Sequence, residues 1–284
     1  MITRRAFLST LGLGAIGATA FSAYAFAFEP LVRLAVTQYR LRPPRWREGA
    51  TMRAVILADI HACDPWMSAA RIAAIVERTN ALAPDIVLLL GDYIAGMRRF
   101  RSAKVPIPVW SAALGKLSAP LGVHAVLGNH DWIEDGDGEG STAALREQGI
   151  AVYENAAVRL GGGDRPEFWL AGLGDQLVRR DDLRATLAAV PDDGLPMLLM
   201  AHEPDIFPQV PEKASLTLSG HTHGGQVALP FFGRPIVPSD YGQRFAYGHI
   251  VEESRHLLVS GGLGCSMIPV RFNCPPEIVV LDLG

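Results

Sequence analysis

Five apolar runs in this chain of 284 residues share one pattern, because each ends in polar side chains that can bind metal ions. Runs that are apolar without alternation are typical of strands covered on both faces. With 49% hydrophobic and 19% charged residues, the chain has enough apolar side chains for a full core. The polar residues that follow the five runs are, in chain order, Asp59 and His61, Asp92, Asn129 and His130, His202, and His221 and His223.

A helical segment separates the first two runs. Apolar residues recur at helical spacing in MSAARIAAIVERTNALAP, and Pro84 stops the helix before the next strand. The order strand, helix, strand indicates an α/β fold with parallel strands. In open α/β sheets, ligands bind outside the carboxyl ends of the strands. We therefore expect the polar residues to converge there, although Asp59 and His223 are far apart in the sequence.

The converging residues favour a transition-metal site. They comprise two carboxylates, one amide oxygen and four imidazoles: Asp59, His61, Asp92, Asn129, His202, His221 and His223. Imidazole suits manganese, iron or zinc, whereas calcium prefers oxygen ligands alone. Seven ligands are too many for one ion, but two ions that share a bridging carboxylate would use four each. Such a pair, about 3.5–4 Å apart, binds the attacking and leaving oxygens in phosphoryl displacement.

These motifs resemble those of the calcineurin-like metallophosphoesterases. The matching elements run from about residue 52 to the end of the chain: Asp59-x-His61, Gly91-Asp92, Gly128-Asn129-His130-Asp131, His202 and Gly220-His221-x-His223. The resemblance implies a four-layer α/β/β/α sandwich of two mixed sheets flanked by helices. It also implies that residues 29–284 form a single metallophosphoesterase domain.

The resemblance further implies a role for each residue. One metal ion would be held by Asp59, His61 and His223, and the other by Asn129, His202 and His221. Asp92 would bridge the two ions. Manganese is the first expectation, with iron or zinc as alternatives. A hydroxide between the ions would attack phosphorus in line.

Three residues beside these ligands have other expected roles. His130 would be the general acid that protonates the departing oxygen. Its alternative role is a structural hydrogen bonder. Asp131 is expected to cap a turn, and Thr222 to be a spacer between two ligands.

The substrate is less constrained by the sequence. The segments GDYIAG and GNHD depart from the motifs of the phosphoprotein phosphatases, which argues against that subclass. The carboxyl-terminal segments look more like the bacterial YkuE/YaeI-like phosphodiesterases, which suggests a small phosphoester, or a membrane-lipid phosphate or pyrophosphate. A formal charge of −3 gives no basic field, so nucleic acid is not an expected partner. The alternatives are a nuclease and a non-catalytic metal-binding scaffold.

The first 28 residues have the layout of an export signal. Arg4 and Arg5 precede an uncharged run that ends in small-x-small sites, and the order of residues resembles a twin-arginine signal. We therefore expect the twin-arginine export machinery as a partner. The protein would be periplasmic or at the outer face of the bacterial inner membrane. The alternative is an uncleaved membrane anchor, since the uncharged run is long enough to cross a bilayer.

Three further features leave alternatives open. Cys265 and Cys274 would either pair or stay free, while Cys63 is expected to be a buried neutral thiol. The basic residues in GMRRFRSAK either contact phosphate or form a solvated loop; they are Arg98, Arg99, Arg101 and Lys104. Phe231 and Phe232 would belong to the core or a lid, line a lipid pocket, or dip into a bilayer.

Overall fold

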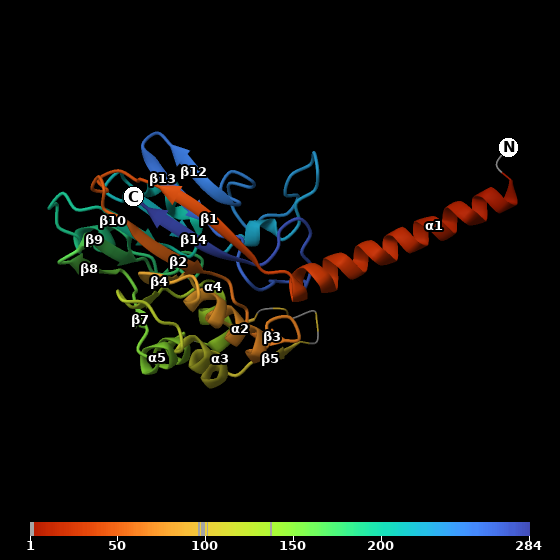
Figure 1. Cartoon of the computed structure of the whole chain (residues 1–284), viewed down its shortest axis with the longest axis horizontal. Helices are drawn as coiled ribbons and strands as arrows, with labels where there is room; N and C mark the ends of the chain where they lie inside the picture. Colours follow the sequence, from red (N-terminus) through yellow and green to blue (C-terminus); the bar gives the residue numbers. More distant parts are fainter. Residues whose placement is uncertain (1–2, 96, 98–99, 101, 137) are drawn as a thin grey trace.

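Two six-stranded mixed sheets stack face to face in the computed structural model, which describes residues 3–95, 97, 100, 102–136 and 138–284 (Figure 1). The first sheet has the order β1 (Ala35–Leu41), β14 (Glu277–Leu283), β2 (Met52–Leu57), β4 (Ile86–Leu89), β6 (Val123–Ala125) and β7 (Ala151–Val152). The second has the order β12 (Gly248–Glu252), β13 (Arg255–Val259), β11 (Leu216–Ser219), β10 (Met197–Met200), β9 (Arg165–Gly172) and β8 (Ala156–Gly162). A short ribbon pairs β3 (Cys63–Asp64) with β5 (Ala103–Lys104).

Each sheet contains a central block of parallel strands. In the first sheet β2, β4, β6 and β7 are parallel, and in the second β9, β10, β11 and β13 are parallel. Antiparallel pairs lie towards the edges, where β14 joins β2, β12 joins β13 and β8 joins β9. All the strands that precede the predicted ligands therefore belong to these parallel blocks.

Helices cover the outer face of each sheet, which confirms the predicted sandwich. The first sheet packs against α2 (Ala69–Asn80), α3 (Ile107–Leu114) and α5 (Glu139–Glu147), with Trp110 of α3 fully buried. The second sheet packs against α6 (Leu183–Ala188) and the 3-10 helix η2 (Pro204–Gln209), a thinner layer. The remaining short helices are α4 (Asn129–Asp135) and η3 (His223–Gly225).

The apolar runs are continuous because both faces of the central strands are buried. On β2, Val55 and Leu57 point to the helix layer, while Ala54 and Ile56 point to the second sheet. Successive side chains of a strand alternate between faces, so each face requires an apolar residue at every second position. The predicted helix after β2 is α2, which Ser68 caps by accepting a hydrogen bond from the backbone N–H of Arg71 (3.3 Å).

The amino-terminal segment forms a helix that leaves the domain. Figure 1 shows α1 (Arg4–Ala23) projecting away from the sheets, and a π-helix, η1 (Tyr24–Val32), joins it to β1. By length and composition, Gly12–Val32 is apolar enough to cross a membrane, as a signal sequence also is. The expected boundary at residue 28 falls inside η1.

The cysteines do not form a disulfide. Cys63, Cys265 and Cys274 are all free and buried. Cys265 packs against Cys63, whereas the Cys274 thiol donates to the carbonyl oxygen of His223 (3.3 Å), so the alternative of a Cys265–Cys274 bond is wrong. Burial raises the pKa of the Cys63 thiol to about 12, as expected for a buried neutral thiol.

Truncation of Leu88 tests the contact between the two sheets. Leu88 is fully buried between them, so Leu88→Ala should lower the free energy of unfolding by about 2–5 kcal/mol, as cavity-forming core substitutions do. Leu177→Ala, at an exposed leucine, is the matched control and should change stability by less than about 0.5 kcal/mol. Urea unfolding measures both, and equal midpoints for the two variants would contradict this packing.

Candidate metal centre

The predicted ligands meet at the carboxyl edge that the two sheets share. Asp59 and His61 follow β2, Asp92 follows β4, and Asn129 begins α4 after β6. From the second sheet, His202 follows β10, and His221 and His223 follow β11. Asp59, His61, Asp92, Asn129, His202 and His223 are buried, and His221 is half-buried.

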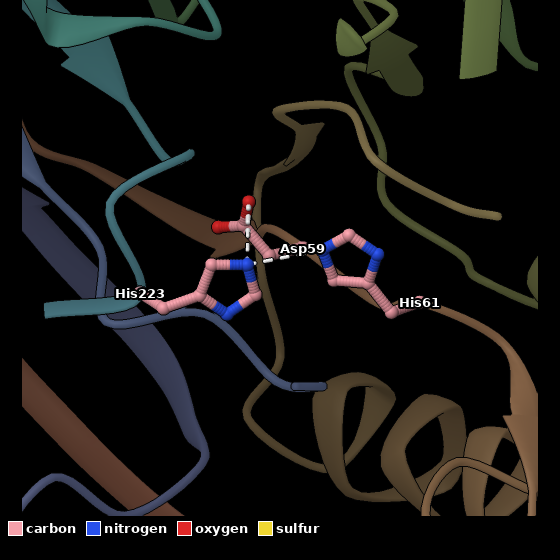
Figure 2. Close-up of side chains that lie close together, drawn as sticks. All are labelled: Asp59, His61 and His223. Carbon is pink, nitrogen blue, oxygen red and sulfur yellow. Dashed lines mark hydrogen bonds and ion pairs between the residues drawn. The ribbon is translucent and has the colours of Figure 1, made fainter. Parts of the chain in front are cut away.

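Asp59, His61 and His223 form the first cluster (Figure 2). The Nε2 atoms of the two histidines lie 3.0 Å apart, and Nε2 of His223 lies 3.7 Å from Oδ1 of Asp59. The Nδ1–H of His61 donates to the carbonyl oxygen of Ile94 (2.9 Å), which leaves its Nε2 lone pair facing His223. Oδ2 of Asp59 is buried and accepts no hydrogen bond. The Asp59 carboxylate and the Nε2 lone pair of His61 therefore point to one place, where a bound cation would offset their negative charge.

Asp92, His202 and His221 form the second cluster. Nδ1–H of His202 donates to the carbonyl oxygen of Leu90 (2.6 Å), so its Nε2 faces the cluster. Asn129 joins from the first sheet, with Oδ1 3.1 Å from Nδ1 of His221. The four residues offer two imidazoles, an amide oxygen and a carboxylate.

One oxygen of Asp92 faces both clusters. Its Oδ2 lies 3.5 Å from Nε2 of His61 and 3.3 Å from Nε2 of His202. Its other oxygen, Oδ1, accepts a hydrogen bond from the backbone N–H of His130 (2.8 Å). The carboxylate is thus held by one oxygen, and the other lies between the first and second clusters.

Charge in the centre is concentrated on Asp92 and His202. Burial opposes ionisation of Asp92, but His202 beside it holds the pKa of Asp92 well below its ordinary value. Burial likewise opposes a charge on His202, but Asp92 raises the pKa of that imidazole well above its ordinary value. Burial lowers the pKa of His61 to about 3 and that of His221 to about 4, so these imidazoles are neutral.

Five of the seven predicted ligands have a left-handed backbone. Their φ angles are 53° for Asp59, 46° for His61, 56° for Asp92, 65° for His221 and 52° for His223. Such angles are uncommon outside glycine and cluster at functional sites. The backbone of Gly220 lies against the Asp59 carboxylate, and a Cβ at position 220 would be only 2.7 Å from Oδ2 of Asp59. Glycine therefore lets the His221 loop approach Asp59 this closely.

His130 lies beside the first cluster. Its ring contacts that of His61 edge-on at 4.9 Å, and its Nε2 lies 3.4 Å from the hydroxyl oxygen of Ser266. Its Nδ1 is buried without a hydrogen-bond partner. A ring nitrogen of His130 lies within 4.8 Å of the ligand atoms of His61 and Asp92, so by distance alone His130 could also bind a cation.

Asp131 caps the turn as expected and also joins two strand ends. Its carboxylate accepts from the backbone N–H groups of Gly128 (2.9 Å), Asp92 (2.9 Å) and Tyr93 (2.8 Å). Thr222 is more than a spacer, because its buried hydroxyl donates to the carbonyl oxygen of Ala246 (2.8 Å) and fixes the loop between two predicted ligands.

The sequence analysis missed a buried arginine and a carboxyl pair. Arg271 is fully buried, with Nη2 3.4 Å from Nδ1 of His223 and Nη1 donating to the carbonyl oxygen of Gly261 (2.9 Å). Asp175 and Glu203 are buried next to His202, and burial together with Glu203 raises the pKa of Asp175 to about 8. Only Glu203, directly after His202, had a sequence signal.

The surface features have separate outcomes. Arg98, Arg99 and Arg101 lie outside the described residues, and Lys104 forms an ion pair with Glu134 (2.8 Å). Phe231 and Phe232 are both exposed, so the alternative that they belong to the core is wrong, while a lid, a lipid pocket and contact with a bilayer stay predictions.

A buried histidine–carboxylate centre at the strand ends of a two-sheet sandwich is the arrangement of a metal-dependent hydrolase, and comparison with known proteins gives the family. Residues 52–225 match the calcineurin-like phosphoesterase family, so the chain belongs to it and is a phosphoric ester hydrolase. It is 32% identical to an uncharacterized metallophosphoesterase of Bacillus subtilis, YkuE, over 99% of this chain and 98% of that protein.

Two further relatives have named activities. The chain is 29% identical to phosphodiesterase YaeI of Escherichia coli over the full length of both proteins. It is 26% identical to the UDP-2,3-diacylglucosamine pyrophosphatase LpxG of Chlamydia muridarum over 96% of each.

Asp131→Asn should destabilise the fold. An amide in place of the carboxylate would direct N–H groups at backbone N–H donors, and buried donors without partners cost about 1–3 kcal/mol each. Asp164→Asn makes the same change in an exposed turn and should have no measurable effect. Urea unfolding measures both, and an Asp131→Asn midpoint equal to that of Asp164→Asn would refute the capping role.

Manganese affinity should fall as the pH falls below about 7. Burial raises the pKa of Asp59 to about 7, and a carboxylic acid must lose its proton before it binds a cation. Protonation of His202 acts in the same direction. Because two protons must be released, titration calorimetry should show affinity falling by up to about a hundredfold per pH unit below pH 7. Asp59→Asn should bind more weakly, with a shallower dependence, and unchanged affinity in the parent between about pH 6 and pH 8 would contradict the expectation.

Proposed function

We propose that the enzyme is a dinuclear metal-dependent phosphoester hydrolase. Asp59, His61 and His223 would hold one cation, and Asn129, His202 and His221 the other. Asp92 would bridge the two. The observation that carries the proposal is the position of the Asp92 Oδ2 atom, 3.5 Å from Nε2 of His61 and 3.3 Å from Nε2 of His202.

The residues fit two cations of the manganese, iron or zinc type. Each cluster offers both imidazole nitrogen and oxygen, a mixture that these metals accept and that calcium does not favour. Oδ2 of Asp59 accepts no hydrogen bond, and the Nε2 lone pair of His61 faces only Nε2 of His223, so both atoms can offer an electron pair to a cation. When bound, such ions lower the pKa of water between them and neutralise phosphate charge.

His130 is assigned as the general acid. Its backbone N–H is bonded to the bridging carboxylate, which fixes the residue beside the centre. The hydroxyl of Ser266 next to its Nε2 is the group that can orient the ring. A histidine in that position can give a proton to the departing oxygen of a phosphoester.

The proposed substrate is a phosphodiester or a membrane-lipid phosphate or pyrophosphate. The names of YaeI, a phosphodiesterase, and LpxG, a pyrophosphatase acting on UDP-2,3-diacylglucosamine, support this class. The apolar amino-terminal helix agrees with a protein that works at a membrane. We further propose export by the twin-arginine route, with the domain periplasmic or at the outer face of the bacterial inner membrane.

Replacement of His130 should separate catalysis from metal binding. His130→Ala should lower kcat on bis-p-nitrophenyl phosphate by about a hundredfold to ten-thousandfold, as loss of a general acid does, with two manganese ions still bound per chain. His249→Ala, on the edge strand β12, is the matched control and should keep full activity. Loss of bound metal from His130→Ala would instead make His130 a ligand.

Replacement of Asp92 should remove the centre itself. Asp92→Ala should lose at least one of the two ions and lower activity by about a thousandfold or more, since the remaining ligands would bring two cations together without a bridging charge. Metal analysis by mass spectrometry and the same diester assay measure both effects. Full activity in Asp92→Ala, or in His202→Ala, would rule out the assignment.

A further inference from the structure

Five large apolar side chains are exposed on two neighbouring loops, which we call the apolar rim. Their exposed fractions are 105% for Phe231, 78% for Phe232, 74% for Ile236, 70% for Met267 and 39% for Ile268. Gln226 joins the two loops, because its amide donates to the carbonyl oxygen of Ile268 (3.1 Å) and accepts from the N–H of Ser266 (2.7 Å). Large apolar side chains exposed on neighbouring loops are typical of a binding surface.

The apolar rim borders the metal centre. The first loop leaves η3, whose first residue is the ligand His223. The second loop contains Ser266, whose hydroxyl oxygen is 3.4 Å from Nε2 of His130. A surface that binds the rim would therefore lie at the edge of the catalytic centre.

The base of the amino-terminal helix is built into the same region. Glu29 of η1 is fully buried and accepts from the backbone N–H groups of Cys274 (2.7 Å) and Asn273 (3.2 Å). The carbonyl oxygen of Ala25 accepts from the N–H of Arg271 (2.9 Å), and Phe21 packs on Phe272 with ring centroids 4.9 Å apart.

The segment that receives η1 also pairs with the first loop of the rim. The N–H of Phe272 donates to the carbonyl oxygen of Gln226 (2.9 Å), and the N–H of Ala228 donates to that of Phe272 (2.8 Å). η1, which we call the foot of the helix, and the apolar rim are therefore parts of one hydrogen-bonded unit. Figure 1 shows the light-blue loops that follow η3 extending on the side of the domain from which α1 leaves.

The exposed helix needs an apolar environment. Leu13 and Ile16 of α1 are 71% and 68% exposed, and no described part of the domain covers them. The segment Gly12–Val32 has the length and composition of a membrane span, but its residues from Tyr24 on belong to η1 and contact the domain. The part left for the bilayer is α1, whose 20 residues rise about 30 Å, close to the thickness of a bilayer core. A bilayer around this helix would meet the face of the domain that carries the apolar rim.

On the basis of the proposed function, we propose that the amino-terminal segment is a retained membrane anchor whose foot, η1, seats the apolar rim and the metal centre against the bilayer. The enzyme then takes phosphoesters carried by lipids of that bilayer. Ala25, a candidate residue for signal cleavage, is fully buried and bonded to Arg271, so cleavage after it would break the contacts that hold the foot.

Retention of the anchor is tested on the protein purified from membranes. Its intact mass should include α1, and it should stay in the membrane pellet after a carbonate wash. A soluble chain that begins at Phe26 or Phe28 would overturn the proposal.

Contact between the rim and the bilayer is tested by fluorescence of the full chain in phosphatidylcholine vesicles. Phe231→Trp should add emission that lipids brominated in their acyl chains quench. Asp164→Trp, in the β8–β9 turn at the opposite end of the parallel strands, is the control and should not be quenched. Equal quenching of both, or of neither, would overturn the proposed orientation.

The lipid-borne substrate is tested with two diesters that share a leaving group. Hexadecyl p-nitrophenyl phosphate in phosphatidylcholine vesicles should be cleaved with a kcat/KM about tenfold or more above that of soluble methyl p-nitrophenyl phosphate, since the rim holds the centre at the surface. The double variant F231S/F232S should lose that advantage and keep its rate on the soluble ester within about twofold.

Two other outcomes separate this inference from the proposed function. An unchanged preference in F231S/F232S would overturn the role of the rim while the phosphoesterase assignment stands. Failure to cleave either ester in the presence of manganese would overturn the proposed function, and with it the lipid substrate.

Discussion

The centre depends on the placement of one carboxylate oxygen, Oδ2 of Asp92, between histidines that come from different sheets. His61 follows β2 of the first sheet, and His202 follows β10 of the second. The distances to both imidazoles hold only while the sheets keep their relative position, which the core between them fixes. Packing of the two sheets is therefore the physical condition under which Asp92 could bridge the two proposed cations.

The loops at this edge hold conformations that local sequence does not favour. Each left-handed residue costs about 1–3 kcal/mol, and five of the seven predicted ligands have this backbone. The cost is offset because rigid strands enter the loops, because Asp131 accepts from the backbone N–H groups of Asp92 and Tyr93, and because Thr222 ties its loop to the carbonyl oxygen of Ala246. Such pre-organisation would hold the predicted ligands in place before a metal ion binds.

The sequence predicted the elements that have a local pattern. Continuous apolar runs identified the buried strands, helical spacing identified α2, and the residues after the strands identified the converging set, whose role as ligands stays a prediction. The order of the second sheet, the buried Arg271 and the pairing of η1 with residues 271–274 could not be predicted, because each depends on contacts between distant segments. Phe231 was ambiguous for a related reason, since hydrophobicity does not tell a core residue from one that faces a membrane.

The central claim is that Asp92 bridges two cations, and anomalous diffraction from crystals of the manganese-loaded protein tests it most directly. The account predicts two peaks about 3.5–4 Å apart, with Oδ2 of Asp92 between them. One peak should be ligated by Asp59, His61 and His223, and the other by Asn129, His202 and His221. A single peak, or a pair of peaks that Asp92 does not contact, would contradict the account.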